Sequence, residues 1–490
     1  MRTLLLLVLL VAGCAVRTPP AIERPNLLFL FADDLRRDAL AAFGGELAPT
    51  PALHALARRG TALDDAYCMG SRHGAVCVPS RAMLLSGRAL PHVRDDLAGV
   101  VTLPELLRER GYATFMAGKW HNGDKALRRA FPAARAVLRG GMSNHFAMDL
   151  CDVEAGEIVR QGVRPGHSTD LFADAAIEFL NSRRGNDEPF FAYVAFTAPH
   201  DPRDPPPAWR ERLARRGRPQ LPANFRGQHG LDLGKATMTV RDENLLGWPR
   251  DPELLRDQLA DYRALIAHLD ARIAEVLTAL RDSGHLDDTI VVFASDHGLA
   301  LGSHGLLGKQ SVYEHSMSTP VVLAGPGVPV GARRDGLCYL LDLMPTLLAA
   351  SGTPAPEGVD GRDLWPLIRG EAGGRDAIVL LYAASQRAVR VGNRKLIRLP
   401  QIDRTLLFDV GDDPDEMRDL ASDPAFADVR ARLEARLRAE QAEVDDELPW
   451  TAPEVQPATI DLTGKRFPPD RWQPDWIVEK YWPEQYWRRR

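Results

Sequence analysis

The chain has few of the residues that would hold a small secreted fold together or bind zinc. Only five cysteines occur in 490 residues, and none of them forms a CxxC pair. Neither a dense disulfide framework nor a zinc site built from paired cysteines is therefore expected, and no spacing selects a disulfide. The formal net charge is only −5, which gives no reason to expect nucleic-acid binding. With 45% hydrophobic and 26% charged residues, the sequence predicts one large folded core with a smaller module.

The first 14 residues, MRTLLLLVLLVAGC, contain an apolar run that is too short to span a bilayer as a mature helix. A run of this kind after one arginine is typical of an export signal. Its end, VAGC, resembles a bacterial lipobox, which would place a lipid on Cys14; the alternative is an ordinary signal peptide cut near residues 12–15. Because Ala15 is not acidic, the resemblance implies an exported lipoprotein of the outer membrane, facing the periplasm or the cell surface.

Apolar segments suited to buried strands alternate along the chain with segments that read as helices. This alternation predicts an α/β fold in which a large, mostly parallel sheet is sandwiched between helices. The expected strands are 26–32, 113–117, 190–196 and 289–294, and the expected helices are 51–59 after a Thr50 cap, 103–110, a helix to 184 capped by Ser168 or Thr169, and 252–281.

The pattern divides the chain into a tether (15–25), a catalytic domain (26–372), a small C-terminal subdomain (373–450) and a tail (451–490). In the subdomain, four short strands with a hairpin turn at Gly392-Asn393 precede an amphipathic helix over 426–444, which predicts a small antiparallel sheet plus a helix. Tryptophan and proline are concentrated in and just before the tail. We expect an irregular strap that buries these rings, with sugar stacking as the alternative.

Four of the predicted strands end directly in polar residues that are capable of chemistry. In open α/β sheets ligands bind beyond the carboxyl ends of the strands, so these side chains are expected to converge. Adjacent carboxylates repel, so an Asp-Asp pair after an apolar strand favours a bound cation over a solvated turn. Oxygen ligands favour Ca²⁺, or alternatively Mg²⁺. The residues at these strand ends are Asp33, Asp34, Lys119, His121, His200, Asp296 and His297.

The segment CVPSRAMLLSGR (77–88) specifies a cysteine at the start of a helix. Pro79 suits a first helical turn and the following AMLL run is helical, so Cys77 is expected at a helix N-terminus, where backbone N–H groups favour an anion. The alternative is an ordinary buried cysteine. The combination of Cys77, Pro79, Ser80, Arg81 and the Gly87-Arg88 close resembles the signature of type I sulfatases.

The resemblance extends over most of the chain. The ordered motifs RPNLLFLFADD, CVPSRAMLLSGR, AGKWHNG, FTAPHDPR, SDHG and HGLLGKQSVYEHSM are similar to those of the sulfatase branch of the alkaline-phosphatase-like superfamily. In that family a maturation enzyme oxidises the signature cysteine, here Cys77, to formylglycine, and the hydrate of this aldehyde is the nucleophile. The family also uses one divalent cation.

The resemblance implies roles for individual residues. Asp33, Asp34, Asp296, His297 and the modified Cys77 match the metal ligands, although many sulfatases carry Asn in place of His297. Arg81 matches the residue that holds the formylglycine hydrate, and Lys119 and His121 match the pair beside the nucleophile, where the His helps to expel sulfate. His200 and Lys309 match the pair that contacts the sulfate and the bridging oxygen, and either could protonate the leaving group.

These observations predict a sulfatase that cleaves O-sulfate esters of a carbohydrate or another small molecule. One alternative is a phosphonate monoester or phosphodiester hydrolase, which can share this nucleophile and metal site. Another is a lipoprotein without activity that binds sulfated glycans. Asn122, where the family often has Leu, and Ser318, where similar sequences commonly have Arg, depart from the pattern.

Overall fold

The structure is a computed structural model that describes residues 17–482. The predicted export signal and Cys14 lie outside this range, as does Trp487 of the tail. Residues 17–25 form neither helix nor strand. Hydrogen bonds from the Gly327 and Val330 N–H groups to the carbonyls of Pro19 and Arg17 join this stretch to the body of the protein. Within residues 17–482, no helix has both the length and the apolar character needed to cross a membrane.

The central strands of the large sheet are the apolar segments that the sequence predicts. β10 (Thr289–Ser295), β1 (Asn26–Asp33), β9 (Phe190–Pro199) and β5 (Ala113–Lys119) lie side by side in parallel. A strand that is buried on both faces needs apolar side chains on both, which explains the continuous apolar runs. Along β1, Leu27, Phe29 and Phe31 join the hydrophobic core on one face, while Leu28, Leu30 and Ala32 join the core on the other.

The complete large sheet has ten strands, in the order β12-β2-β11-β10-β1-β9-β5-β6-β7-β8. β11 runs antiparallel to β10, and β7 and β8 form an antiparallel edge, while the centre is parallel. The predicted fold class is therefore confirmed, although the sequence did not reveal these outer strands. Their bounds are β2 Thr61–Leu63, β6 Ala134–Leu138, β7 Ala147–Glu154, β8 Glu157–Pro165, β11 Val321–Ala324 and β12 Ala332–Arg334.

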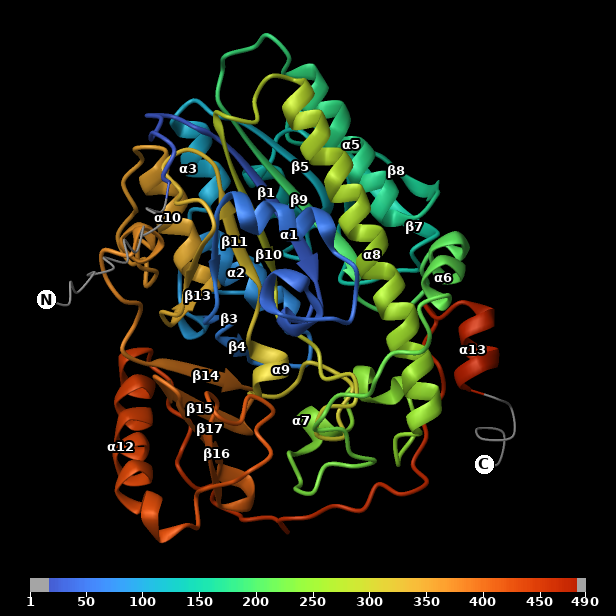
Figure 1. Ribbon diagram of the computed structural model, residues 1–490, viewed down its shortest axis with the longest axis vertical. Coiled ribbons are helices and arrows are strands. Elements are labelled where there is room, and N and C mark those ends of the chain that lie inside the picture. Colours follow the sequence, from blue (N-terminus) through green and yellow to red (C-terminus); the bar gives the residue numbers. More distant parts are fainter. Residues whose placement is uncertain (1–16, 483–490) are drawn as a thin grey trace, which may run out of the picture.

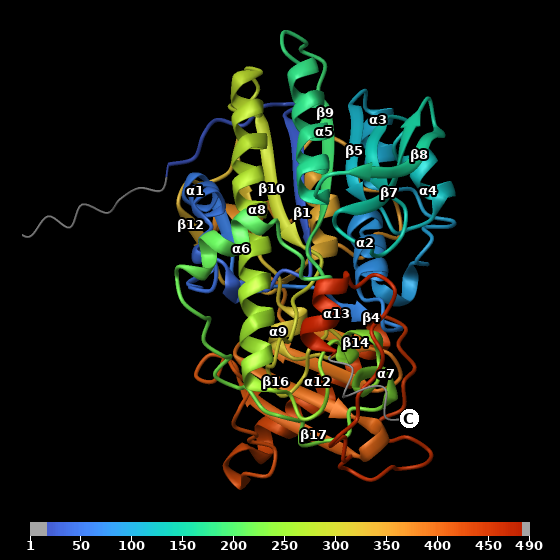
Figure 2. The same ribbon diagram turned by 90° about the vertical axis from the view of Figure 1, so that its right-hand side faces the viewer.

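Helices cover both faces of the large sheet (Figures 1 and 2). One face carries α1 (Pro51–Arg59), α5 (Ser168–Ser182) and α8 (Pro252–Asp282). The other carries α2 (Cys77–Ser86), α3 (Leu103–Glu109) and α10 (Leu343–Ala350). The shorter elements are β3 Ala66–Tyr67, β13 Cys338–Tyr339, α4 Asp124–Ala130, α6 Pro207–Ala214, α7 Lys235–Met238, α9 Glu314–Met317 and α11 Trp365–Arg369.

Two predictions of helix caps are wrong. Thr50 precedes α1 but makes no capping bond; instead Asp270, from α8, accepts hydrogen bonds from the N–H groups of Ala52 and Leu53. At α5 the cap is His167, whose ring nitrogen accepts the Thr169 N–H. At α1 a distant side chain replaces the hydroxyl cap that local preference favours, whereas at α5 the cap lies one residue before Ser168 and is an imidazole in place of a hydroxyl.

The C-terminal subdomain is a five-stranded sheet, in the order β17-β16-β15-β14-β4, with α12 (Ala427–Glu443) packed on it. Four of its strands come from the predicted region: β14 Ile378–Tyr382, β15 Gln386–Val391, β16 Arg394–Leu399 and β17 Arg404–Asp409. The fifth, β4 (Gly70–Ser71), comes from just before α2 and pairs in parallel with β14. A Cβ atom at Gly70 would lie 1.8 Å from the Leu381 carbonyl oxygen, so this close pairing requires glycine.

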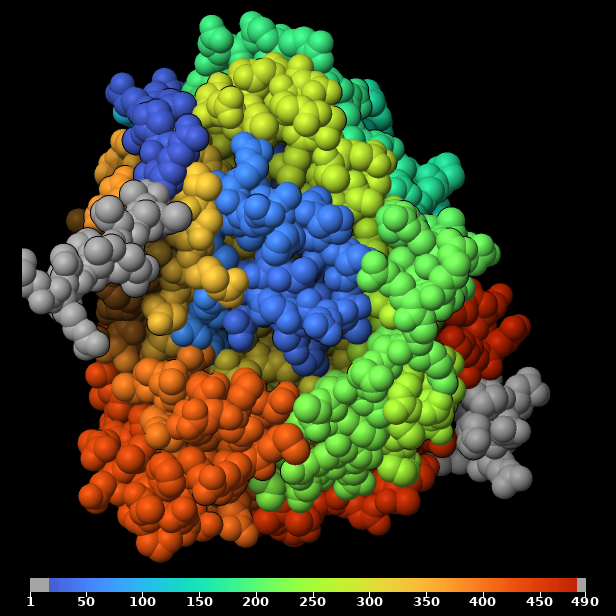
Figure 3. Space-filling model, in the orientation of Figure 1, coloured from blue at the N-terminus to red at the C-terminus, as the bar shows by residue number. Residues whose placement is uncertain are grey.

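The tail runs from under the small sheet along the lower edge of the molecule (Figures 1 and 3). Residues 445–474 form no helix or strand, and a short helix that the sequence did not predict, α13 (Asp475–Tyr481), follows. Backbone hydrogen bonds connect the tail to residues 232, 248 and 401 of the body. The tail rings stack on arginines: Trp450 on Arg398 and Arg438, and Trp476 on Arg210. These two rings thus make contacts within the protein.

Candidate active site

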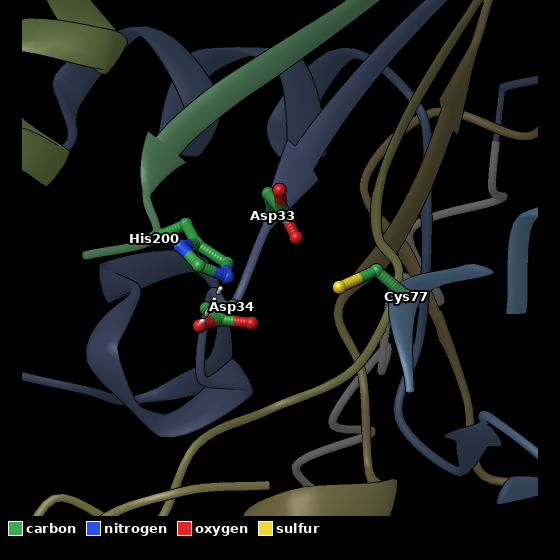
Figure 4. A group of neighbouring side chains, drawn as sticks. All are labelled: Asp33, Asp34, Cys77 and His200. Carbon is green, nitrogen blue, oxygen red and sulfur yellow. Dashed lines mark ion pairs between the residues drawn. The ribbon is translucent and has the colours of Figure 1, made fainter. Parts of the chain in front are cut away.

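The polar residues that follow the central strands converge at the carboxyl edge of the large sheet. Asp33 ends β1, Lys119 ends β5, His200 follows β9, and Asp296 follows β10. Figure 4 shows Asp33 and Asp34 beside His200, with the Cys77 thiol pointing toward the same space. Parallel strands deliver their carboxyl ends to one edge, so a sequence pattern spread over more than 250 residues forms one cluster.

Cys77 is the first residue of α2, and local contacts hold this helix end in place. The Ser80 hydroxyl donates to the Asp296 carbonyl oxygen at 2.7 Å. The Asn122 amide donates to the carbonyl oxygens of Val78 (3.0 Å) and Asp95 (2.7 Å). Asn122, which departs from the family pattern, therefore anchors the start of α2.

The predicted metal ligands lie close enough together to share one ion. The ligand atoms of Asp33, Cys77, Asp296 and His297 lie within 4.8 Å of one another, and those of Asp33, Asp34, Cys77 and His200 form an overlapping group. His297 donates its Nδ1–H to the Gly298 carbonyl oxygen at 2.9 Å, which leaves the buried Nε2 without a partner. Oδ1 of Asp33 is also buried and unpartnered. The hydrogen bond at Nδ1 fixes the orientation of the His297 ring and leaves the lone pair of Nε2 available. Such an imidazole nitrogen and the neighbouring carboxylate oxygens are suitable ligands for a divalent cation.

Three buried cations face the three carboxylates of this cluster. The shortest distances are 2.5 Å from Lys119 Nζ to Asp33 Oδ2, 2.8 Å from Lys309 Nζ to Asp34 Oδ1, and 3.3 Å from Arg81 Nη2 to Asp296 Oδ2. Buried charges without such partners would be costly. The pairing keeps the lysines and the arginine charged beside Cys77, where they can hold an anionic group.

The charges of the cluster shift the pKa values of its members in consistent directions. Burial would raise the pKa of the Cys77 thiol, but Lys119 and Lys309 hold that pKa well below its ordinary value. Burial would lower the pKa of His200, but the Asp34 carboxylate raises it to about 9. Burial lowers the pKa of His121. The surroundings of Cys77 thus favour negative charge at that position.

His121 and His200, the two histidines that line the cleft, are fixed by different neighbours. His121 has a positive φ of 75°, and its ring lies against Gly141, where a Cβ atom would come within 2.4 Å of Nε2. His200 donates its Nδ1–H to the Asp201 carbonyl oxygen at 2.7 Å, and its own carbonyl accepts the Nε2–H of His145 at 3.0 Å. Its Nε2 lies 3.7 Å from Asp34 Oδ2.

A cleft of about 340 Å³ opens above the cluster and is lined by Cys77, His121, His200 and Lys309. This volume is at the lower end of the range of small-molecule sites, about 300–1,000 Å³. The remaining predicted site residues, Asp33, Asp34, Arg81, Lys119, Asp296 and His297, are buried near it and are not among the residues that line the cleft. The structure therefore brings all the predicted residues together: four line the cleft, and the other six are buried beside it.

Several residues that shape the site were not identified from the sequence. Asp242 lies 3.6 Å from Lys309 Nζ. Glu243 accepts hydrogen bonds from the N–H groups of Leu307 and Gly308, just before Lys309, and pairs with the buried Arg250. Asp242 and Glu243 lie in a short 3₁₀ helix (Arg241–Leu245) with no strand end or motif to mark them, so only their long-range contacts reveal them.

The four described cysteines, Cys68, Cys77, Cys151 and Cys338, have free thiols.

Three further histidines near the motifs contact residues outside the catalytic cluster. His73 pairs with Asp95 at 2.6 Å, and His304 and His315 stack on Tyr313. None of these three is among the residues that line the cleft.

Comparison with known proteins identifies this arrangement. Residues 25–353 match the family model "Sulfatase", and residues 302–443 match the model "N-sulphoglucosamine sulphohydrolase, C-terminal". N-acetylglucosamine-6-O-sulfatase of Bacteroides thetaiotaomicron is 26% identical over 89% of this chain and 90% of its own length. Human arylsulfatase A is 30% identical over 70% of this chain and 71% of its own length.

Solved structures share the fold. A protein in complex with its substrate D-glucosamine-2-N,6-O-disulfate superimposes with a TM-score of 0.71 at 24% identity, covering 87% of this chain and 99% of that chain. Phosphonate monoester hydrolase of Agrobacterium radiobacter gives a TM-score of 0.67 at 23% identity, covering 86% and 96%. The family model spans more than half of the chain, and the chain therefore belongs to the sulfatase family and is a sulfuric ester hydrolase.

Proposed function

We propose that this sulfatase hydrolyses O-sulfate esters of a carbohydrate, with formylglycine formed from Cys77 and one divalent cation. The observation that carries the proposal is the position of Cys77, at the N-terminus of α2, facing the cleft between Lys119, Lys309 and the carboxylate cluster. The names of two relatives support a carbohydrate substrate: N-acetylglucosamine-6-O-sulfatase and the ulvan-active sulfatase of Formosa agariphila.

Asp33, Asp34, Asp296 and His297, together with residue 77, would hold the cation, with Ca²⁺ preferred and Mg²⁺ as the alternative. When bound, such an ion withdraws electron density from a sulfate oxygen and acidifies a coordinated hydroxyl. The hydrate of the aldehyde at position 77 supplies the attacking oxygen.

The protein's own side chains then have distinct tasks. Lys119, Lys309 and Arg81 offset the negative charge that grows on the sulfate oxygens, which is usually the largest catalytic contribution. His121, at the cleft beside residue 77, is positioned to take a proton from the hydroxyl at that position as sulfate departs. His200 and Lys309 line the same cleft, and either can donate the proton that the departing alcohol needs.

Mass spectrometry of the peptide that contains residue 77, after co-expression with a formylglycine-generating maturation enzyme, tests the nucleophile. We expect loss of the sulfur and a carbonyl that reacts with hydroxylamine, together with release of inorganic sulfate from an aryl sulfate. A fully active preparation with an unmodified Cys77 thiol would refute the proposal.

A phosphonate monoester or phosphodiester hydrolase is the alternative enzyme, because a structural neighbour with that name shares the fold. Parallel assays with an aryl sulfate, an aryl phosphodiester and an aryl phosphonate distinguish the two. We expect sulfate release to be much the fastest reaction. Binding of sulfated glycans with no turnover of any ester would instead support a lipoprotein without activity.

Export as an outer-membrane lipoprotein remains part of the proposal. It rests on the VAGC sequence at 11–14; anchoring by several acyl chains would be stable, at about 0.8 kcal/mol per buried CH₂. Cys14→Ser should move the protein from the membrane fraction to the soluble fraction with unchanged kinetics. A wild-type protein whose mature N-terminus is not Cys14 would contradict it.

A further inference from the structure

The outer part of the cleft, beyond the catalytic residues, is mostly apolar. Its lining there comes from Gly74, Ala75, Gly141, Met142 and Val240. None of these side chains carries a charge or a hydrogen-bonding group, so this wall suits an apolar face of a leaving group.

The only polar side chains in that outer part of the described lining are Arg241, Asp242 and Gln310. Gln310 and Asp242 both make polar contacts within the protein. The Gln310 amide donates to Asp242 Oδ2 and to the Gly74 carbonyl oxygen, both at 2.8 Å. Asp242 also lies 3.6 Å from Lys309 Nζ.

Arg241 is the one cation among the described residues that line the outer cleft, and three carboxylates pair with it, of which Asp242 Oδ1 lies 3.4 Å from its Nη1. Its Nη1 donates to Asp201 Oδ1 at 2.7 Å, and its Nη2 pairs with the other oxygen of the same carboxylate. Its Nε donates to Asp470 Oδ2 at 2.8 Å. Asp201 follows His200 directly, whereas Asp470 belongs to the tail, so a segment at the far end of the chain reaches the rim of the cleft.

Gln473, also in the tail, strengthens this arrangement. Its amide donates to Asp201 Oδ2 at 3.1 Å and to Asp470 Oδ2 at 3.3 Å. Gln473 is buried, and the side chain of Asp470 is only 24% exposed. Three carboxylates, those of Asp201, Asp242 and Asp470, thus surround one guanidinium. On the catalytic side, Lys309 Nζ lies 3.6 Å from Asp242 and His200 Nδ1 lies 3.5 Å from Asp201.

We propose that the cleft selects sulfate esters with a compact, uncharged leaving group, and that Asp470 of the tail is a positioning residue that enforces this by adding a carboxylate to the group around Arg241, whose charge Asp201 already offsets. The proposal rests on the sulfatase function proposed above. A second sulfate or a carboxylate on the leaving group would find an apolar wall and a guanidinium with no free charge. It would also be repelled by Asp201 and Asp470, and an unpaired anion in such a site is unfavourable.

The scaffold itself does not impose this selection. The structural neighbour described above was solved with a disulfated glucosamine as its substrate, so a protein of this fold accepts a second sulfate. Selection against a charged leaving group would therefore come from the side chains at the cleft and not from the fold.

The test uses two aryl sulfates of similar leaving-group basicity, with an acetamido group para to the ester in one and a carboxylate in the other. For the wild-type enzyme we expect kcat/KM to be roughly tenfold or more higher for the acetamido compound, because like charges in a partly buried site repel strongly. Equal or higher kcat/KM for the carboxylate compound would overturn the inference while leaving the sulfatase function intact. Hydrolysis of neither compound would count against the proposed function itself.

Asp470→Asn tests the role of the tail. The preference for the acetamido compound should fall roughly three- to fivefold, as expected for one partly exposed charge, and the change should shrink as ionic strength rises. Asp470→Glu should retain the wild-type preference. In the Asp470→Asn background, Arg241→Gln should remove the gain for the carboxylate compound, because Asp201 and Asp242 then lack the cation that offsets their charge.

Asp475→Asn, on the exposed start of α13, is the matched control and should leave the preference unchanged. If Asp470→Asn and Asp475→Asn have the same preference as the wild type, Asp470 does not set the selectivity. If Asp470→Asn instead slows both compounds equally at every ionic strength, its role is only structural and the inference is overturned.

Discussion

Two clusters of buried charge lie in this protein, and they serve different ends. One is the catalytic cluster at the carboxyl edge of the large sheet. The other lies where the small sheet meets the main domain, around Lys395 of β16. Lys395 is fully buried and contacts Glu314 at 2.9 Å and Glu416 at 2.8 Å. Glu314 also accepts the Tyr67 hydroxyl at 2.5 Å.

The difference between the clusters lies in their unpartnered atoms and in what they border. In the catalytic cluster, the buried atoms Asp33 Oδ1 and His297 Nε2 have no hydrogen-bond partner, although His297 Nε2 lies 3.5 Å from Asp296 Oδ1, and the cluster lies beside the cleft that Cys77 lines. In the Lys395 cluster each charged group has an ion-pair partner. Glu416 Oε1 also has no hydrogen bond, but Lys395 Nζ lies 2.8 Å from it, and the cluster borders no nucleophile. Buried charge by itself therefore does not identify a site; unmet ligand atoms next to a nucleophile do.

Removing the nucleophile should have the largest effect on activity and almost none on stability. In Cys77→Ala the covalent step is lost, so kcat for an aryl sulfate should fall by roughly 10⁴-fold or more. The melting temperature should remain within a few degrees of the wild-type value, since alanine also suits the start of α2. Residual activity of the purified variant above one per cent would show that Cys77 is not the nucleophile.

Breaking the other cluster should have the opposite result. Lys395→Met leaves Glu416 buried without its cation and Glu314 with Arg390 alone, and this should lower the free energy of unfolding by about 3–5 kcal/mol. The kcat of the folded fraction should change little. Urea unfolding and active-site titration measure the two quantities.

Lys480→Met is the control, because Lys480 makes a partly exposed pair with Asp257 and its loss should cost at most about 1 kcal/mol. A large fall in kcat of folded Lys395→Met, or no loss of stability, would mean that the two clusters are not functionally separate.

Asp296→Asn tests whether the unmet atoms of the catalytic cluster hold a metal. Loss of one carboxylate ligand should weaken metal affinity and lower activity by about 100-fold or more, with part of the activity recovered at high Ca²⁺ or Mg²⁺. Elemental analysis after dialysis gives the metal content independently of activity. The control is Asp287→Asn, at an exposed position before β10, which should keep both the metal content and the activity of the wild type. An active wild-type enzyme that contains no metal would contradict the prediction.

Gly141→Ala tests whether activity depends on the exact position of the His121 ring. The added methyl group would come within 2.4 Å of the His121 ring, so the ring must move, and kcat/KM should fall by roughly 10–100-fold. At the adjacent Gly140 a Cβ atom would meet nothing within 4 Å, which makes Gly140→Ala a matched control with near-normal activity. Similar activity of the two variants would show that the position of His121 is not critical.

Much of the fold and of the catalytic cluster could be predicted from the sequence, because the information is local. Continuous apolar runs indicated the parallel strands of the centre, and polar residues directly after them indicated the edge where ligands bind. The start of α2 at Cys77 follows from Pro79 and the helical run after it. Parallel strands that share one edge leave little freedom in where Asp33, His200 and Asp296 meet.

Tertiary structure alone decided the features that depend on which distant segments meet. The sequence did not show that Asp270 would cap α1, that β4 would complete the small sheet, or that Glu243 would hold the loop before Lys309. It also did not show that Asp470, in a tail without periodicity, would reach Arg241 at the cleft. Strand periodicity and helix signals act over a few residues, whereas ion-pair partners are chosen by packing among segments far apart in the chain. For this protein the sequence alone determined the chemistry of the site, and the tertiary structure decided which charges remain free to meet the substrate.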